Sequence, residues 1–500
     1  MRKFLLLFAF IFSVWTLQAQ STDNKCWAID YETWNTTGQP SLFIDCGNDE
    51  AFNLNEELSL EVWVRAFTFA ENRKIMGKIF YQDPINNGYV LGFENLHVYA
   101  EFFNPSAQQV PRPGDGPIEP DSSFVHLVTT FSVSSGKIKN YVNGVLSGET
   151  SMFPNAPISP NDNPFIIGNA PWDMLSFQFY GDMDEVRVWN KALSATEINA
   201  AMHHELSGTE PNLVAYYNFN EASGSTIPDS GPNGFDGTLS NSEHESTGFV
   251  TSGAPVGNSI MADMTDIKAA WYRNSENHHR ITSDYGITLI SNIQEKEFRK
   301  YLVVGQNELE GVSTDFAPEN PPNGFMRSSK EFYINAAGNV GGSLTIMLED
   351  AVAMDIPAEA DINRYALLHR ANADDNFTAV MRPTRPLAGV FQWNDITFKD
   401  GFYAIGYAEE EFPIQGWIAV QENAFAKLIL APNPVKESLQ LKGIPPNTTL
   451  SIYALSGARI KTLKLDSFQQ NIDLSNLEKG IYIAVFESDK GITTNKIIKQ

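Results

Sequence analysis

The chain of 500 residues has only two cysteines, Cys26 and Cys46, and few basic residues. Two cysteines cannot form a zinc, thiol-protease or Cys-x-x-Cys redox motif at this spacing. The 35 Lys and Arg residues are outnumbered by 60 Asp and Glu residues, which gives a formal net charge of −25. Because this charge would repel nucleic-acid phosphates, we predict no nucleic-acid partner.

Long apolar runs are missing beyond the N-terminus. Met1 to Gln20 has basic Arg2 and Lys3 followed by a short apolar run, which predicts a cleaved signal peptide at residues 1–20. No later stretch approaches the length of a membrane-spanning helix, so we predict no transmembrane span. We therefore expect the mature protein outside the cytoplasm, either soluble or attached to a surface.

Common catalytic and metal-binding signatures are absent as well. The sequence has no G-x-S-x-G nucleophile elbow, no H-E-x-x-H zinc motif and no P-loop. Adjacent histidines occur at His203-His204 and His278-His279. Because adjacent side chains point in different directions, we interpret both pairs as surface residues and not as metal ligands.

The clearest positive signal is the stretch from Gly181 to Ala200. GDMDEVRVW alternates along its length, which predicts a strand over Gly181–Trp189. Ser194 is then expected to cap a short helix, with Glu197 as its reciprocal partner in a capping box. The alternation predicts that Val186 and Val188 lie on one face of the strand, and Met183, Glu185, Arg187 and Trp189 on the other.

This stretch resembles the closing motif of laminin-G-like, concanavalin A-like jelly-roll modules, G-x-I-D-E-V-R-I-W-N-x-A-L-S-x-x-E-I. FIDCGNDEAFNL near the N-terminus and residues 212–239 resemble further elements of the same family. The Asn143-Gly144 pair between them favours a type I′ hairpin turn. The resemblance implies a jelly roll over residues 21–255. Other predicted strands of this module are Leu58–Arg65, Gly88–Phe93, His97–Phe103, Phe124–Phe131 and Lys137–Val142.

Two more modules follow. Residues 259–410 contain alternating runs separated by Gly, Pro and Asn turns, which predicts a second β-sandwich. Pieces of it, such as FYINAAGNVGGSLTIMLED, resemble a module of large secreted proteins of Bacteroidetes-type bacteria. We interpret the acidic and apolar residues 411–427 as a linker.

Residues 428–500 contain a Pro-Asn-Pro run, the string LEKGIY and a basic C-terminal end. Together these resemble the type A sorting domain of the type IX secretion system. The resemblance implies an outer-membrane translocon as partner, and export through the periplasm and outer membrane to the cell surface or medium. The expected fold class is therefore all-β: a concanavalin A-like jelly-roll sandwich, a second β-sandwich and a small C-terminal β-sandwich sorting domain.

The jelly-roll resemblance also implies a structural calcium ion, because related modules often hold one. Carboxylates and Asn amides are oxygen ligands of the kind that calcium prefers. Alternatively, such residues stabilise turns. The candidate ligands are Asn48, Asp49, Asp182, Asp184 and Asp229.

The cysteines and two aromatic residues are further candidate sites. In an exported chain Cys26 and Cys46 form either a disulfide or two buried thiols. Trp172 and Tyr180 precede the Gly181 strand, where an exposed ring would stack against a sugar. Both rings are equally compatible with a place in the core.

Three functions remain open. The first is a non-catalytic protein that binds a glycan or a cell-surface ligand through the jelly roll. The second is a hydrolase of O-glycosyl compounds, which requires two carboxylates about 5 Å apart if it retains configuration. Laminarinase-like members of this fold carry E-x-D-x-x-E on one strand, and that string does not occur here. We interpret Glu61, Glu185, Arg65 and Arg187 as cross-strand ion pairs instead. The third is a structural adhesin.

Overall fold

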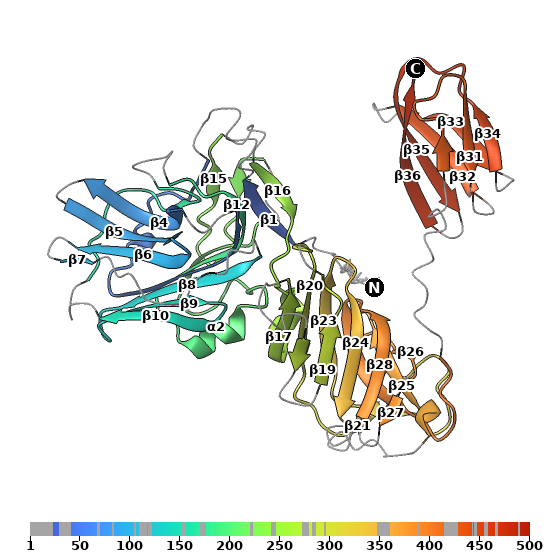
Figure 1. Cartoon of the computed structure of the whole chain (residues 1–500), viewed down its shortest axis with the longest axis horizontal. Coiled ribbons are helices and arrows are strands. Elements are labelled where there is room, and N and C mark those ends of the chain that lie inside the picture. The colour runs from blue at the N-terminus through green and yellow to red at the C-terminus, as the bar shows by residue number, and fades with distance from the viewer. Residues whose placement is uncertain are drawn as a thin grey trace, which may run out of the picture.

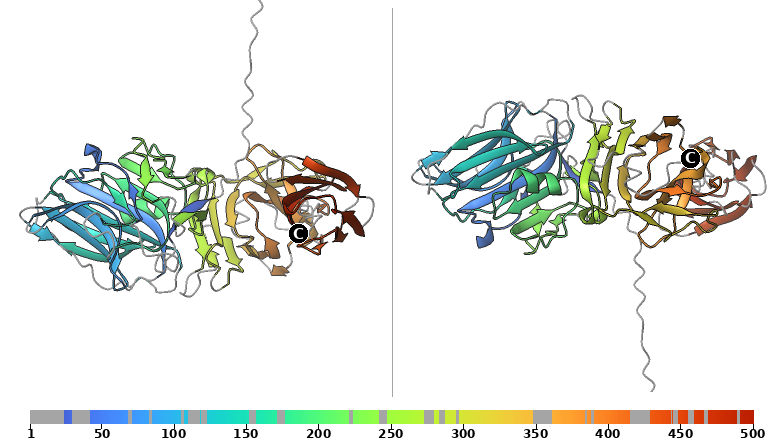
Figure 2. Two further views of the ribbon diagram at one scale, coloured as in Figure 1. Left: turned by 90° about the horizontal axis from the view of Figure 1, so that it is seen from above. Right: turned by 90° about the horizontal axis from the view of Figure 1, so that it is seen from below.

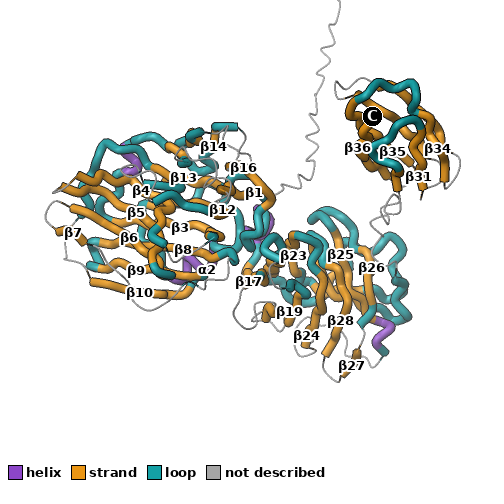
Figure 3. Tube along the Cα trace, turned by 45° about the horizontal axis from the view of Figure 1, so that its top comes forward, coloured by secondary structure: helices purple, strands orange, loops and turns teal. Residues whose placement is uncertain are grey.

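A computed structural model of the protein describes most of the chain, and its described part is built of antiparallel strands (Figures 1 and 3). The all-β fold class is therefore confirmed. The predicted signal peptide, Trp172, His278-His279 and the linker beyond Ile414 lie outside the described residues. The residues described are 24–29, 42–67, 71–82, 85–104, 107–109, 118, 123–151, 157–170, 177–220, 224–241, 247–272, 280–282, 287–294, 297–347, 361–383, 385–387, 390–414, 429–442, 444, 448–454, 459–465, 469–488 and 491–500.

The first module is a sandwich of two sheets. Sheet A has the strand order β10-β9-β8-β3-β12-β1-β16, with β13 beside β12, and sheet B has the order β14-β15-β2-β11-β4-β5-β6-β7. The elements of the module are β1 (Lys25–Ile29), β2 (Ile44–Asp45), η1 (Glu50–Phe52), β3 (Glu57–Ala66), β4 (Arg73–Gln82), β5 (Ile85–Glu94), β6 (His97–Asn104), β7 (Ala107–Gln109), β8 (Val125–Ser132), β9 (Lys137–Val142), β10 (Val145–Ser151), β11 (Ile166–Ile167), β12 (Gly181–Trp189), α2 (Ala195–Ala201), β13 (Leu213–Tyr217), β14 (Thr226–Ile227), β15 (Gly237–Leu239) and β16 (Thr247–Thr251).

Alternation along the strands builds the core between these two sheets. Successive side chains of a strand point to opposite faces, so every second residue of β3 faces sheet B. Leu58, Leu60, Val62 and Val64 of β3 accordingly pack in the core with Leu91 of β5. The predicted capping box is present too, because Ser194 and Glu197 exchange hydrogen bonds at the start of α2. Strand positions and helix start thus agree with the sequence pattern.

The second module is also a sandwich. One sheet has the order β17-β20-β23-β29-β22-β21, with β25 and β26 beside β29, and the other has the order β18-β19-β24-β28-β27. Its elements are η2 (Ser259–Asp263), β17 (Thr265–Trp271), β18 (Arg280–Thr282), β19 (Ile287–Ser291), β20 (Tyr301–Gln306), β21 (Val312–Ser313), β22 (Met326–Ser328), β23 (Phe332–Ala337), β24 (Gly341–Met347), η3 (Ile362–Arg364), β25 (Tyr365–Arg370), β26 (Thr378–Met381), β27 (Arg385–Leu387), β28 (Val390–Thr397) and β29 (Gly401–Tyr407).

The first two modules share a hydrophobic cluster at their junction. Strand β17 lies on the side of the second module next to the jelly roll (Figure 1), and the two sandwiches lie side by side when seen from above or below (Figure 2). Trp63 and Phe124 of the jelly roll pack there with Trp271 and Tyr301 of the second module. Residues 252–258 connect the modules and are held by both, since His203 bonds the carbonyl of Pro255 while Asn258 donates to the Tyr333 hydroxyl. The second module therefore closes part of the face of sheet A that lies away from the jelly-roll core.

The third module has a core of its own. Its two sheets have the orders β30-β31-β34 and β33-β32-β35-β36, and Leu439, Leu450 and Phe486 meet between them. Its strands are β30 (Ile429–Ala431), β31 (Ser438–Lys442), β32 (Thr448–Ala454), β33 (Arg459–Leu465), β34 (Gln469–Asp473), β35 (Gly480–Ser488) and β36 (Gly491–Lys499). Among the described residues, no helix is long and apolar enough to cross a membrane.

Candidate functional site

The strand predicted most clearly from the sequence contains a β-bulge. Asp184 of β12 pairs with Trp63 of β3, but the next pair is Arg187 with Glu61, so β12 has one extra residue. The extra residue is Glu185, and its φ of 53° lies in the left-handed region that non-glycine residues rarely adopt. Met183 therefore shares the core face with Val186 and Val188. The prediction that Met183 lies on the same face as Arg187 was wrong, because simple alternation does not continue through a bulge.

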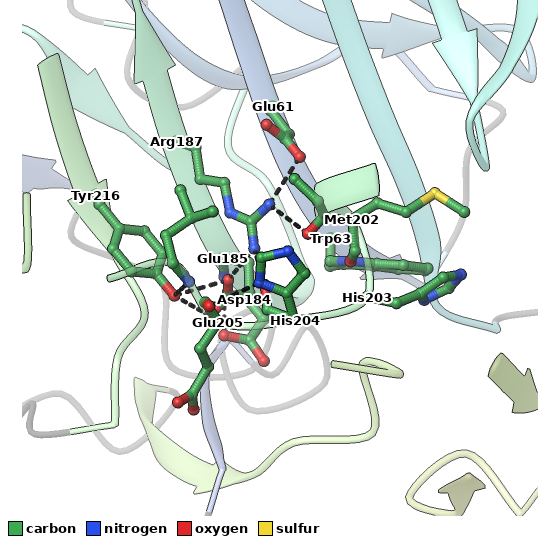
Figure 4. A network of polar contacts seen from close by, with 12 residues as sticks. Glu61, Trp63, Asp184, Glu185, Arg187, Met202, His203, His204, Glu205 and Tyr216 are labelled. Atoms are coloured by element: carbon green, nitrogen blue, oxygen red, sulfur yellow. Dashed lines mark hydrogen bonds and ion pairs between the residues drawn. The ribbon is translucent and has the colours of Figure 1, made fainter. Parts of the chain in front are cut away.

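Arg187 is the centre of a buried polar network on the outer face of sheet A (Figure 4). Its guanidinium donates to Glu61 at 2.9 Å, to Glu185, and to the carbonyls of Ala201 and His204. Ala201 is the last residue of α2 and His204 follows it, so one side chain joins the sheet to the end of the helix. The cross-strand pairing predicted for Glu61 and Arg187 is confirmed.

Glu61 accepts hydrogen bonds from three groups. Besides Arg187, the ring nitrogen of His126 lies 3.0 Å from the carboxylate and the indole of Trp189 donates at 3.0 Å. Burial raises the pKa of Glu61, but Arg187 and His126 outweigh it and hold this pKa at about 2. Glu61 is thus a stable anion in a sealed position, which suits a structural ion pair and not a general acid.

Three further carboxyl groups of this network, those of Glu185, Asp184 and Glu205, have fewer positive partners than Glu61. Glu185 accepts from the Tyr216 hydroxyl at 2.7 Å, Asp184 accepts from Ser252 at 2.6 Å, and Glu205 accepts from Asn220 at 2.8 Å. Burial, followed by the charge of Glu185, raises the pKa of Asp184 well above its usual range and the pKa of Glu205 to about 7. The network therefore retains protons near neutral pH.

The raised pKa of Glu205 leads to a pH-dependent prediction. The folded state keeps this proton to about pH 7, whereas the unfolded chain loses it near pH 4.5, so wild-type stability should fall between these values. Glu205→Gln should remove the part of that fall that is due to Glu205, and above pH 7 the free energy of unfolding of the variant should exceed that of the wild type by up to roughly 3 kcal/mol. Urea unfolding at pH 5, 6, 7 and 8 measures the difference. If the free energies of unfolding of the wild type and of Glu205→Gln change with pH in the same way, the prediction is contradicted. Glu319→Gln, which changes an exposed carboxylate, is the control.

The candidate calcium ligands are used by other partners. Asp182 pairs with Arg65 at 2.8 Å and with Arg299 at 3.0 Å. Asp184 accepts from Ser252 and from the Glu185 amide. Asp229 accepts from the backbone amides of residues 216, 231 and 235. Each of these carboxylates is thus engaged in an ion pair or in hydrogen bonds with other parts of the chain.

The remaining two candidates lie in a loop beside sheet B. Asn48 donates to the carbonyl of Asp162, and Asp49 caps η1 by accepting from Ala51. The buried ammonium of Lys78 donates to the nearby carbonyl of Asn163. Burial lowers the pKa of Lys78, and the charges of Asp162 and Asp49 oppose this shift. Among the residues that the structure describes, no group of three or more His, Cys, Asp or Glu is placed to hold a metal. A calcium site stays a prediction.

Cys26 and Cys46 are both free and buried, so the disulfide alternative was wrong. Cys26 lies on β1 in the junction cluster, where the Arg299 guanidinium donates to its sulfur at 3.3 Å. Cys46 follows β2 of sheet B and packs in the jelly-roll core. The two thiols belong to different sheets and to different hydrophobic clusters, which the sequence spacing does not reveal.

Two aromatic predictions are also corrected. Tyr180 is 5% exposed and packs in the core, with the Arg73 guanidinium 5.1 Å from its ring centre. It is therefore not an open stacking surface. His203 was expected at the surface but is buried between the rings of Trp63 and Trp271. His203 follows the short helix at the junction, where Trp271 of the second module packs against its ring.

A second polar cluster lies on the face of sheet B turned away from the core. Lys74, Gly92 and Tyr99 are paired across β4, β5 and β6, whereas Leu91 beside them faces the core. The Lys74 ammonium lies 3.8 Å from the Tyr99 ring centre and 3.7 Å from Glu101. Because Gly92 has no side chain, Lys74 reaches across β5 to Tyr99.

We name Lys74, Tyr99, Glu101 and Phe177 the sheet B cluster. The Tyr99 hydroxyl donates to Glu101, and the ring centre of Phe177 lies 5.4 Å from the Lys74 ammonium. Burial lowers the pKa of Lys74 to about 8 against the charge of Glu101. An ammonium, a carboxylate, a hydroxyl and two rings thus converge beneath one face, with Lys74, Tyr99 and Glu101 only 2–8% exposed. Sequence reasoning missed it, although a lysine within an apolar strand run was a visible signal.

Comparison with protein families identifies two parts of the chain. Residues 41–199 match the concanavalin A-like lectin/glucanases superfamily. Residues 430–500 match the secretion system C-terminal sorting domain. The jelly-roll and sorting-domain resemblances are confirmed, and the sorting domain indicates export to the cell surface or the extracellular space. The resemblance of residues 259–410 to a module of secreted proteins stays a prediction. No curated protein matches the chain.

Solved structures with similar folds include three β-sandwich proteins. A candidate carbohydrate binding protein from Bacteroides ovatus is 20% identical with a TM-score of 0.35, and the match covers 47% of this chain and 61% of that one. A heptameric SAP-like pentraxin from Limulus polyphemus is 14% identical with a TM-score of 0.28, over 36% and 83% of the chains. The CBM40 of Ruminococcus gnavus IT-sialidase, bound to α2,3 sialyllactose, is 14% identical with a TM-score of 0.26, over 31% and 91%.

Proposed function

We propose that this exported protein binds carbohydrate through its concanavalin A-like module and does not cleave it. The observation that carries the proposal is the match of residues 41–199 to the concanavalin A-like lectin/glucanases superfamily. Within this module, the rings and hydrogen-bonding groups of the sheet B cluster converge beneath one sheet face. Lys74, Tyr99 and Glu101 are 2–8% exposed, so we expect them to support the binding surface from below. Ligand sites combine apolar and aromatic surface with a few polar groups that fix orientation. Membership of a lectin and glucanase superfamily supports sugar as the ligand class.

The absence of cleavage is supported by the state of the carboxylates in the Arg187 network. Glu61, Asp184 and Glu185 are each at most 1% exposed and accept hydrogen bonds from neighbouring groups. A glycosidase needs one carboxyl group to donate a proton and another to attack the sugar or a water. Carboxylates sealed beneath α2 and the second module do not meet a polysaccharide chain.

The experiment applies the full-length chain to a glycan array and, in parallel, to a reducing-sugar release assay. We expect binding without release, whereas release would support a hydrolase and silence in both assays would support an adhesin. Lys74→Met keeps a similar volume but removes the ammonium, and should weaken binding at least tenfold.

Lys78→Met is the matched control for this experiment. Lys78 is a buried lysine on the same strand, and it donates to Asn163 instead of joining the sheet B cluster. Binding by the Lys78 variant should equal that of the wild type. Equal losses in both variants would contradict the proposed surface and indicate a general effect on β4.

We also propose that residues 428–500 bind the type IX secretion translocon. The match to a sorting domain covers this module, and its hydrophobic core consists of its own residues, including Leu439, Leu450 and Phe486. A module with its own core at the C-terminal end of the chain can be recognised without disturbing the two sandwiches that precede it.

A further inference from the structure

The second module presents an exposed aromatic ring on a constrained backbone. Phe316 follows β21 and is 37% exposed, with φ 54°. A bulky residue in this left-handed region is an outlier, and such conformations persist only where the surroundings hold them. Here the carbonyl of Phe316 accepts a hydrogen bond from the Phe377 amide at 2.8 Å. Two loops therefore hold the ring in one place.

Charged groups support this ring from the protein side. The Arg370 guanidinium lies 4.2 Å from the ring centre of Phe316, and Arg327 lies 6.0 Å from it. Both arginines are ion-paired to Glu331, at 2.7 Å and 2.9 Å. All three charged residues are buried, so the stack beneath the ring is fixed while part of the ring is open to solvent.

The surface around Phe316 is polar and uncharged or negative. Residues 307–325 include four acidic residues and no lysine or arginine. The loop that holds Phe316 through Phe377 adds exposed Asn and Asp side chains at residues 372–376. Carboxylates and amides accept and donate hydrogen bonds with hydroxyl groups, whereas this charge disfavours an anionic ligand.

We propose that Phe316 and its rim form a binding site for a neutral saccharide, with the Phe316 ring stacked against the apolar face of the sugar. A rigid ring surrounded by hydrogen-bonding groups suits a ligand with apolar C–H faces and hydroxyl edges. The site is separate from the sheet B cluster. Its strand β21 is the opposite edge of the sheet from β17, which lies at the junction (Figure 1).

The test is affinity electrophoresis of the full-length chain in gels containing neutral glucans, mannans or galactans. Phe316→Ala should reduce retardation at least tenfold in one of these polysaccharides, while Phe316→Trp should preserve it. Leu309→Ala is the matched control, because Leu309 is 59% exposed in the same segment and is not part of the stack. Melting temperatures of all variants show whether each is folded.

Comparison of Phe316→Ala with Lys74→Met distinguishes binding at Phe316 from binding by the jelly roll. If Phe316→Ala loses retardation in a gel and Lys74→Met does not, the result supports the Phe316 site and contradicts a role of the sheet B cluster in binding that polysaccharide. The reverse result overturns the Phe316 site and leaves the proposed function standing. Absence of retardation for the wild type in every gel, or equal retardation of wild type and Phe316→Ala, also overturns it, and a protein ligand would then be sought.

Discussion

Arg187→Met is expected to destabilise the protein by roughly 3–5 kcal/mol, because it leaves buried carboxylates without their cation. Arg187 is 0% exposed and donates to both Glu61 and Glu185. It also donates to two carbonyls at and just beyond the end of α2, so in the variant the end of the helix loses its contact with sheet A. Urea unfolding at pH 7, followed by tryptophan fluorescence, measures the change.

Two comparisons identify the cause of this loss. Lys137→Met breaks an ion pair of similar length, 2.7 Å to Glu149, but at the surface, where water screens the charges and little change is expected. Adding Glu61→Gln and Glu185→Gln to Arg187→Met removes the uncompensated charges and should recover part of the stability. If the triple variant is no more stable than Arg187→Met, lost packing and not buried charge is responsible.

Trp271→Ala is expected to cost a similar amount, roughly 3–5 kcal/mol, and to uncouple the first two modules. The Trp271 ring meets Trp63 edge-on at 5.6 Å and His203 at 5.5 Å, and its indole donates to the carbonyl of Phe124 at 3.0 Å. All three partners belong to the jelly roll. Scanning calorimetry of the full chain should show these modules unfolding together in the wild type and in two separate transitions in the variant.

Trp393→Ala is the control for this uncoupling. Trp393 is 0% exposed in the core of the second module and is not part of the junction cluster. Its loss should lower the melting temperature comparably while both modules still unfold together. A single transition in the Trp271 variant would show that residues 252–258 and the Arg299 ion pair suffice to couple the modules.

Local patterns in the sequence predicted much of the fold. The alternation over Leu58–Arg65 corresponds to β3, and the Asn143-Gly144 pair has the two positive φ values of a hairpin turn. Ser194 and Glu197 form the capping box as expected. These features depend on residues a few positions apart, and their physical causes act within one strand, turn or helix start.

The candidate site was predicted less well, because its contacts are between distant residues. Lys74 meets Tyr99 only after β5 has brought β4 and β6 together, with Gly92 between them. Tyr180 was interpreted as a possible stacking ring, yet it is buried beneath Arg73. Exposure of an aromatic ring depends on what packs over it, and no local pattern records that.

The sequence by itself determined that this is an exported, all-β protein of three modules, because strand periodicity, turn residues and family motifs each involve residues that are close together in the chain. Apart from the pair of Glu61 and Arg187, only the tertiary structure decided which polar residues face each other. The extra residue at Glu185 moves Met183 into the core, and the second module buries His203 at the junction. The reason is physical: strand register and contacts between modules join residues far apart in the chain, so they follow from packing and not from periodicity.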